Sequence, residues 1–253
     1  MGEELKSTIR KGWDASAKGY TNVVSDDFHE PISKEWTDLI LSFAPAEGRM
    51  RILDVGTGPG VFATLMSKAG HDAVGIDISD SMLEEARNNS RLAGASPEFV
   101  RMDSDRLEFP DNSFDMIINR NVLWIMPDPV AVYKEWLRVL KPGGRLLYFD
   151  GVHPAREKDY DFKAHDLKSI GRIEGGKPVK TSVTKENYDV TRGWKKELPL
   201  SFVERPKWDL ENAAKVGFVG IECADFLGVE SDPRYKDPNR EYRMFRLSAS
   251  KPQ

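Results

Sequence analysis

The chain has 253 residues, of which 40% are hydrophobic and 31% are charged, with a formal net charge of −4 and a pI of about 5.7. These values are typical of a soluble globular protein with room for one large domain. The acidic balance disfavours an electrostatic grip on nucleic acid, so no nucleic-acid partner is expected. The single cysteine, Cys223, excludes an intramolecular disulfide and a thiolate metal cluster, and no metal site is predicted.

The first residues are polar, and no apolar run reaches the length of a signal peptide or a membrane-spanning helix. The expectation is therefore a cytoplasmic protein that does not associate with membranes.

Two helices are predicted near the N-terminus, at residues 5–19 and 31–43. In the second, Pro31 suits the first turn, and the apolar residues recur at i, i+3, i+4 and i+7, which gives one buried face. That face consists of Trp36, Leu39, Ile40 and Phe43.

An alternation of strands and helices follows. Strands are predicted at 51–55, 73–76, 98–102, 114–119 and 145–149, and helices at 61–69, 81–92 and 129–140. Asp80 is expected to cap the second of these helices, and the adjacent Ile117 and Ile118 suit a strand buried on both faces. Strands separated by helices of this length predict a parallel sheet.

The periodicity lapses over residues 152–206, which are polar with scattered glycine and proline. It resumes with a helix at 210–216, for which Gly217 is a suitable C-terminal cap, and with strands at 220–226 and 243–250. Because no helix separates these last two strands, one of them must run antiparallel to the rest of the sheet.

The turn after the first strand, at residues 56–60, reads GTGPG. Glycines allow a close backbone approach to a ligand, and the helix that follows offers free N–H groups at its N-terminus. In an open α/β sheet, ligands bind at this carboxyl end of the strands. The dinucleotide fingerprint G-x-G-x-x-G requires a glycine at position 61, where this chain has Val61, so the turn indicates a nucleoside site of another kind.

Acidic and polar residues follow in a characteristic order. Asp54 stands two residues before the first glycine, Asp77 ends the second strand, and Asp103 ends the third. A carboxylate in the position of Asp77 can accept both hydroxyls of a ribose. The fourth strand ends in Asn119-Arg120-Asn121, and residues 138–146, RVLKPGGRL, join a helix to the fifth strand.

Together these motifs resemble the class I S-adenosylmethionine (SAM)-dependent methyltransferases, strongly over residues 10–150 and by topology over 207–250. The resemblance implies an α/β, Rossmann-like, doubly wound seven-stranded sheet that is mostly parallel, with an antiparallel last strand. It also implies one domain, with an N-terminal helical cover (1–45), a cofactor-binding core (46–151), a substrate lid insertion (152–206), and a C-terminal helix and hairpin (207–253).

By the same resemblance, the glycines pack on the methionine part of SAM, Asp54 supports them, Asp77 binds the ribose, and Asp103 meets the adenine amino group. The full set of implied cofactor-binding residues is Tyr20, Asp54, Gly56, Thr57, Gly58, Gly60, Asp77, Ile78, Met82, Asp103, Ser104, Asn119, Arg120 and Asn121.

The implied reaction is an SN2 transfer of the SAM methyl group to a small-molecule acceptor, which leaves S-adenosylhomocysteine (SAH). Candidate catalytic residues are His153, just after the fifth strand, and Tyr20. Candidate substrate residues are His29, Trp124 and His153. Packing or surface roles are the alternatives for these residues. Residues 163–207 carry 11 Lys and Arg against 6 Asp and Glu, which indicates either an anionic acceptor or a solvated lid surface.

Two other functions remain open at this point: a regulatory protein that binds SAM or SAH without catalysis, and an NAD(P)-dependent oxidoreductase. The absence of a glycine at position 61 disfavours the second. The protein is expected to be a monomer or a homodimer.

Overall fold

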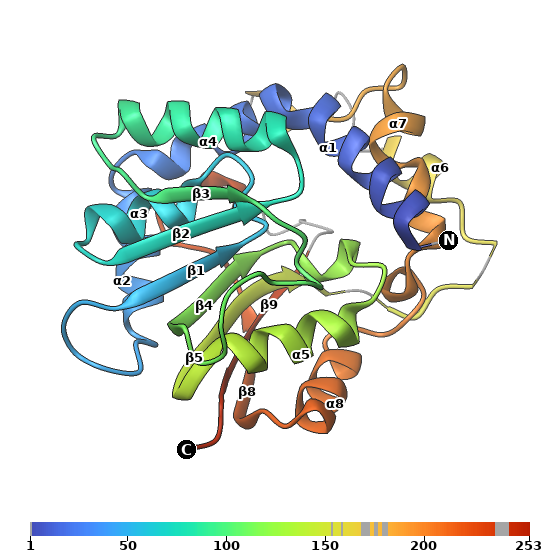
Figure 1. Cartoon of the computed structure of the whole chain (residues 1–253). Helices are drawn as coiled ribbons and strands as arrows, with labels where there is room; N and C mark the ends of the chain where they lie inside the picture. Colours follow the sequence, from blue (N-terminus) through green and yellow to red (C-terminus); the bar gives the residue numbers. More distant parts are fainter. Residues whose placement is uncertain are drawn as a thin grey trace.

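A seven-stranded sheet in the order β3-β2-β1-β4-β5-β9-β8 forms the centre of the molecule (Figure 1). The computed structural model describes residues 2–152, 154–157, 159–167, 173–174, 177–178, 182–235 and 243–253. The strands of this sheet are β1 (Arg51–Val55), β2 (Asp72–Asp77), β3 (Glu98–Arg101), β4 (Phe114–Arg120), β5 (Leu140–Gly151), β8 (Val219–Phe226) and β9 (Met244–Ser250).

The topology confirms the predicted fold. The first five strands pair in parallel, whereas β9 lies between β5 and β8 and is antiparallel to both. Within this sheet, β9 therefore runs opposite to the other six strands, as expected from the terminal hairpin.

Helices cover both faces of the sheet, which gives three layers (Figure 1). Trp36 and Ile40 of α2 pack with α3 against one face, and Tyr133 and Trp136 of α5 pack with Ala213 of α8 against the other. The longer helices are α1 (Gly2–Val24), α2 (Ile32–Leu41), α3 (Val61–Lys68), α4 (Asp80–Leu92), α5 (Pro129–Val139) and α8 (Lys207–Val216).

The strand β4 is buried on both of its faces, as predicted. Ile117 belongs to the hydrophobic cluster beneath α5, and Ile118 to the cluster beneath α2 and α3. Gly217 ends α8 in the left-handed conformation with φ +116°, which agrees with its predicted capping role.

Three local predictions are corrected by the structure. Helix α1 extends well beyond the predicted 5–19 because its buried face continues to Val24. Helix α4 is capped by Ser79 and not by Asp80, since the Ser79 hydroxyl accepts the Met82 backbone N–H at 3.1 Å. Strand β5 begins at Leu140, where an irregular pairing with β4 lets the turn at 142–144 bulge out of the ladder.

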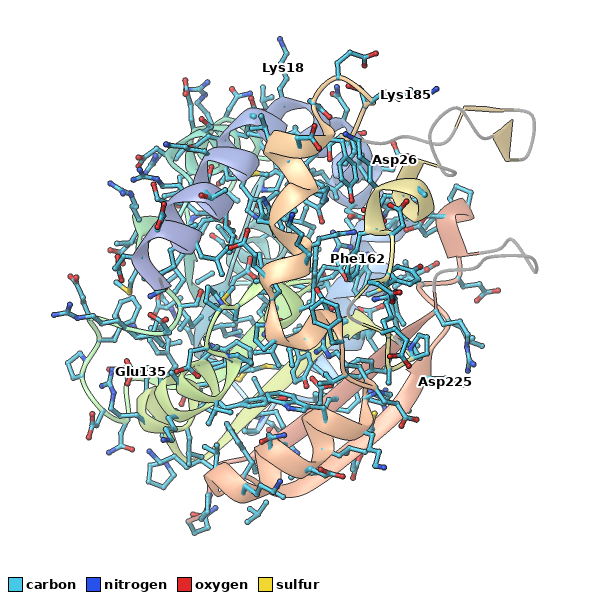
Figure 2. The ribbon with its side chains drawn as sticks, turned by 90° about the vertical axis from the view of Figure 1, so that its right-hand side faces the viewer. Lys18, Asp26, Glu135, Phe162, Lys185 and Asp225 are labelled. Carbon is cyan, nitrogen blue, oxygen red and sulfur yellow. The ribbon has the colours of Figure 1, made fainter. Side chains whose placement is uncertain are left out.

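The segment 152–206 contains short helices where the sequence shows no periodicity. They are α6 (Phe162–Leu167), α7 (Tyr188–Arg192), and the 3-10 helices η3 (Gly193–Glu197) and η4 (Pro199–Ser201). Helix α7 lies beside α1 (Figures 1 and 2). The two are so close that a Cβ on Gly12 would lie 2.7 Å from the Val190 carbonyl oxygen.

None of the helices in the described part of the chain combines the length and the apolar character needed to cross a membrane.

Candidate functional site

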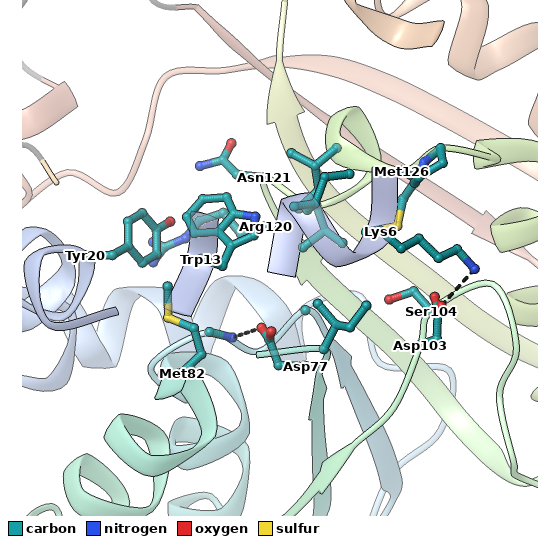
Figure 3. Close-up of a pocket in the computed structure, with 17 residues that line it drawn as sticks. Lys6, Trp13, Tyr20, Asp77, Met82, Asp103, Ser104, Arg120, Asn121 and Met126 are labelled. Carbon is teal, nitrogen blue, oxygen red and sulfur yellow. Dashed lines mark hydrogen bonds and ion pairs between the residues drawn. The ribbon is translucent and has the colours of Figure 1, made fainter. Parts of the chain in front are cut away.

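A pocket lies at the carboxyl ends of the central strands, and helix α1 runs along its edge (Figure 3). The loops that follow β1, β2, β3 and β4 form its floor, and one face of α1 forms a wall. Its lining residues are Lys6, Ile9, Trp13, Tyr20, Gly56, Gly58, Asp77, Ile78, Met82, Asp103, Ser104, Arg120, Asn121, Val122, Ile125, Met126 and Pro127.

The glycine turn forms part of this pocket, and it needs glycine for two different reasons. Gly56 and Gly58 have φ values of +61° and +52°, in the left-handed region that favours glycine. A Cβ on Gly56 would also clash with Val122, at 2.6 Å, whereas a Cβ on Gly58 would point toward the Tyr20 ring at 3.8 Å. Gly60 does not line the pocket; a Cβ there would meet Ala86 of α4 at 2.8 Å, so it serves helix packing.

Asp54 supports the turn from below and does not line the pocket. Its Oδ2 accepts the Thr57 hydroxyl at 2.6 Å and the Ala63 backbone N–H at 3.0 Å, so it ties the turn to the first residues of α3. Burial raises the pKa of Asp54 to about 7, although these hydrogen bonds oppose the shift. Thr57 likewise belongs to the support of the turn, since its backbone N–H donates to the Ile76 carbonyl.

Asp77 points into the pocket from the end of β2 (Figure 3). Its two carboxylate oxygens accept the backbone N–H groups of Gly58 and Ser79, each at 2.9 Å. Burial raises the pKa of Asp77 to about 6 against the effect of these hydrogen bonds. Ile78 and Met82 line the pocket beside it. Asp77 and the glycine turn are separated in sequence by α3 and the rest of β2, yet a hydrogen bond joins them directly.

The end of β3 supplies a second acidic group. Asp103 and Ser104 both line the pocket, and Lys6 reaches across from α1 to pair with Asp103 at 2.8 Å and Asp105 at 2.7 Å (Figure 3). The ion pairs hold the first turns of α1 over this end of the pocket.

The residues after β4 divide between the pocket and the core. Arg120 lines the pocket while its guanidinium pairs with buried Asp27 at 2.7 Å. Asn121 also lines it, with φ +60°, a left-handed conformation that asparagine tolerates better than most residues. Asn119 is fully buried and does not line the pocket, and neither of its side-chain polar atoms has a hydrogen-bond partner among the described residues.

The candidate catalytic and substrate residues are scattered. Tyr20 lines the pocket, and its ring lies edge-on to that of Trp13. Trp124 lies behind the lining, where its indole N–H donates to the Asn121 carbonyl at 3.0 Å. His29 is exposed in the turn before α2 and does not line the pocket. His153 lies outside the described residues.

Sequence reasoning assigned Tyr20 of α1 to the site but missed three further residues of the same helix. Lys6, Ile9 and Trp13 line the pocket together with Tyr20, at spacings of i, i+3, i+7 and i+14. Those spacings place them on one helical face, and that pattern is visible in the sequence once the helix is extended past residue 19. Val122, Ile125, Met126 and Pro127 were also missed, since they follow the β4 motif without a distinctive pattern.

Comparison with known proteins agrees with this arrangement. A family model described as a methyltransferase domain matches residues 53–148. The ubiquinone/menaquinone biosynthesis C-methyltransferase UbiE of Desulfotalea psychrophila is 35% identical over 156 residues, covering 61% of this chain and 62% of that protein. UbiE of Shewanella halifaxensis is 31% identical over 172 residues, covering 66% and 68%. The chain therefore spans about three fifths of the first of these relatives.

Solved structures share the fold at lower identity. The phosphoethanolamine N-methyltransferase 2 of Haemonchus contortus, in complex with phosphomonomethylethanolamine and SAH, matches with a TM-score of 0.65 and 19% identity, covering 95% of this chain and 58% of that one. The [4+2]-cyclase SpnF matches with a TM-score of 0.65 and 21% identity, covering 96% and 95%. Given the family model, the extent of the UbiE match and the shared fold, the chain belongs to the class I SAM-dependent methyltransferase family.

Proposed function

We propose that the protein is a SAM-dependent methyltransferase that acts on a small-molecule acceptor. The observation that carries this proposal is the alignment of the glycine turn, Asp77 and Asp103 along one pocket. A nucleoside with an amino-acid tail needs a glycine surface, a ribose acceptor and a polar group for its base, in this order. The names of the relatives, a C-methyltransferase and an N-methyltransferase, support the reaction class.

The residues present suit SAM. Gly58 leaves open a space that any side chain would enter, and the adjoining turn would hold the methionine portion. Asp77 has two acceptor oxygens for the ribose hydroxyls, and Ile78 offers an apolar surface to the adenine. Asp103 and Ser104 would meet the polar edge of the base. When bound, SAM supplies an electrophilic methyl group on a sulfonium sulfur, and SAH remains after transfer.

The contribution of the protein to this reaction is mainly placement. Tyr20 and Trp13 of α1 and Asn121 after β4 surround the turn, so they can exclude water and orient an acceptor. Holding two reactants in line is worth up to about 7–11 kcal/mol of the barrier. An acceptor that binds in its protonated form requires a base as well, and the assignment of this role to His153 stays a prediction.

The lid role of residues 152–206 is part of the same proposal. Helix α7 packs on α1 and η3 places Trp194 against Trp13, so the segment adjoins the wall of the pocket. A segment in this place separates the acceptor site from solvent.

The fold alone does not decide the reaction, since one protein with the same fold is named as a [4+2]-cyclase. A SAM- or SAH-binding protein without methyl transfer therefore remains the second candidate.

Thermal shift and calorimetric titration with SAM, SAH, NAD⁺ and NADP⁺ test the cofactor. We expect stabilisation by SAM and SAH alone, because a ligand that binds only the folded state raises its melting temperature. SAH formation is then measured with SAM and a panel of small acceptors. Stabilisation by NAD(P) alone would overturn the proposal, and SAM binding without SAH formation across the panel would favour the regulatory alternative.

A further inference from the structure

A cluster of tryptophans and cations lies directly behind the α1 wall of the pocket. It consists of Trp13, Trp124, Arg192, Trp194 and Lys195, and we call it the tryptophan–cation cluster. Trp13 lines the pocket itself, and Trp124 is bonded to pocket-lining Asn121. The other three members come from α7 and η3, the part of the chain that packs on α1 (Figure 2).

The cations lie on the indole faces. The Arg192 Cζ is 4.6 Å from the ring centroid of Trp13 and 5.9 Å from that of Trp194. The Lys195 Nζ is 5.3 Å from the ring centroid of Trp124, which in turn packs on Trp194 at 5.8 Å. Aromatic faces stabilise cations and hold their side chains in place.

The cluster has more hydrogen-bond donors than acceptors. Lys195 pairs with Asp166 at 2.6 Å, but the only hydrogen bond of Arg192 among the described residues goes to the adjacent Thr191 carbonyl. The indole N–H of Trp13 is buried and has no partner in the described structure. The N–H of Trp194 also has no partner there, but it faces Gly12 in the contact with α1. Buried donors left without acceptors cost free energy, so such a site favours a ligand that only accepts hydrogen bonds.

The charge of the cluster points the same way. Burial lowers the pKa values of both Arg192 and Lys195, and the carboxylate of Asp166 opposes this shift in both. For Lys195, the nearby charges of Arg192 and Arg156 add to the lowering. A bound anion would offset both the desolvation and the repulsion. Carboxylate and phosphate oxygens are acceptors that match an arginine fork.

We propose that the tryptophan–cation cluster binds an anionic group, a carboxylate or a phosphate, of the methyl acceptor. This inference rests on the proposed function, and it adds the chemical class of the substrate. The acceptor would occupy the pocket, with its anionic group past Trp13 and toward Arg192 and Lys195. Its nucleophilic atom would then face the glycine turn.

Three other lysines of the segment provide a contrast. Lys163, Lys185 and Lys196 are exposed, as a solvated lid surface requires. Lys195 and Lys196 are neighbours on η3, yet one is directed at Trp124 and the other at solvent. This pair gives a matched control.

The test is calorimetric titration of the SAH-saturated protein with three probes: benzoate, phenyl phosphate and benzamide, which is the neutral analogue of benzoate. We expect at least one of the two anions to bind about tenfold or more tightly than benzamide. Arg192→Gln and Lys195→Gln should each weaken the binding of that anion by about tenfold, the loss typical of a charge-assisted hydrogen bond. Lys196→Gln should bind it as the wild type does, and Arg192→Lys should recover part of the loss. The preferred anion distinguishes a carboxylate from a phosphate acceptor.

Equal binding of benzamide and the anions, or no binding of either anion, would overturn the inference. So would an Arg192→Gln protein that folds, binds SAH and keeps full anion affinity. If Arg192→Gln does not fold, Lys195→Gln against Lys196→Gln decides the question. A protein that fails to bind SAH at the outset contradicts the proposed function instead, so the two failures are distinguishable.

Discussion

At the scale of single residues, Asp77 is the side chain on which the proposed cofactor site most depends. Asp77→Asn keeps the shape of the side chain but replaces one acceptor oxygen with an NH₂ donor. Both oxygens of Asp77 accept backbone N–H groups, so the new donor would face one of these N–H groups and leave it without an acceptor. We expect the Kd for SAH to rise by about 10- to 100-fold, as for the loss of a hydrogen bond to a charged group. Isothermal titration measures this.

The matched control for this substitution is Asp80→Asn. Asp80 is three residues away, its side chain is 69% exposed, and it lies 3.6 Å from Arg101. Its substitution should leave SAH affinity unchanged. Equal effects of the two substitutions would contradict the assigned role of Asp77.

The raised pKa of Asp54 predicts that the stability of the ligand-free protein depends on pH. Its pKa is about 7 in the folded state, above the ordinary value of 3.8, with burial as the main cause; Arg120 opposes the rise and Asp77 adds to it. The folded state therefore binds more protons than the unfolded state between about pH 4 and 7, and the free energy of unfolding falls as pH rises through this window.

Asp54→Asn should remove the part of that fall that Asp54 causes, because the amide does not titrate while its oxygen can still accept from Thr57 and Ala63. Asp77, with a pKa of about 6, keeps a smaller fall below about pH 6 in both proteins. The decrease in the free energy of unfolding that Asp54 causes over this window is at most about 4 kcal/mol, since each unit of pKa shift corresponds to about 1.36 kcal/mol. Urea unfolding of wild type and variant at pH 5, 6, 7 and 8 measures it. Parallel profiles for the two proteins would show that Asp54 is not the group responsible.

Residues inside motifs could be assigned to the pocket region from the sequence, and residues outside them could not. Asp77 and Asp103 follow strands, so the sheet topology alone brings them together. Lys6 and Trp13 reach the same pocket from α1, where they stand 45 and 38 positions before the start of β1, and only the packing of α1 decides this. Asn119 shows the opposite case, since its place in a motif suggested a ligand contact whereas its side chain is buried in the core.

At the scale of elements, the contact between α1 and α7 depends on Gly12. Helix propensity alone predicts that Gly12→Ala stabilises the protein by about 1 kcal/mol. The structure predicts the opposite sign, because the new Cβ would lie 2.7 Å from the Val190 carbonyl oxygen and 2.8 Å from the Trp194 Nε1. We expect a destabilisation of about 1–3 kcal/mol, as for overpacking in a core.

Thermal unfolding measures the effect of Gly12→Ala, and Gly2→Ala is the comparison, since a Cβ at Gly2 would meet nothing within 4 Å. A Gly12→Ala protein more stable than the wild type would mean that α1 and α7 are not in this contact.

Most strands of the sheet could be predicted closely, β5 being the exception, and the short helices could not. Runs of apolar residues bounded by polar or glycine residues identify β1 and β4 to within a residue or so, since burial on both faces dictates their composition. Helix α7 has only five residues, fewer than two turns, so no periodicity can appear in its sequence. Its position is determined by contacts with α1, more than 160 residues earlier in the chain.

At the scale of the whole molecule, a buried ionic network joins three parts of the chain. Arg205, at the end of the segment 152–206, donates to Asp150 of β5 at 2.9 Å and to Asp209 of α8 at 2.9 Å. All three side chains are fully buried. Tyr148 donates to the same Asp209 carboxylate at 2.9 Å. We infer from these connections that the chain folds as a single domain and that the segment 152–206 does not fold on its own.

Two measurements test this inference. Arg205→Met leaves two buried carboxylates without their cation and should lower the free energy of unfolding by about 3–5 kcal/mol. Arg243→Met removes an exposed pair with Asp225 and should cost less than about 1 kcal/mol. In both proteins, urea transitions followed by tryptophan fluorescence and by circular dichroism should coincide, because Trp194 beside α1 and Trp136 in the core would unfold together. A fluorescence transition that precedes the loss of secondary structure would instead mean that the segment 152–206 detaches from the sheet before the sheet unfolds.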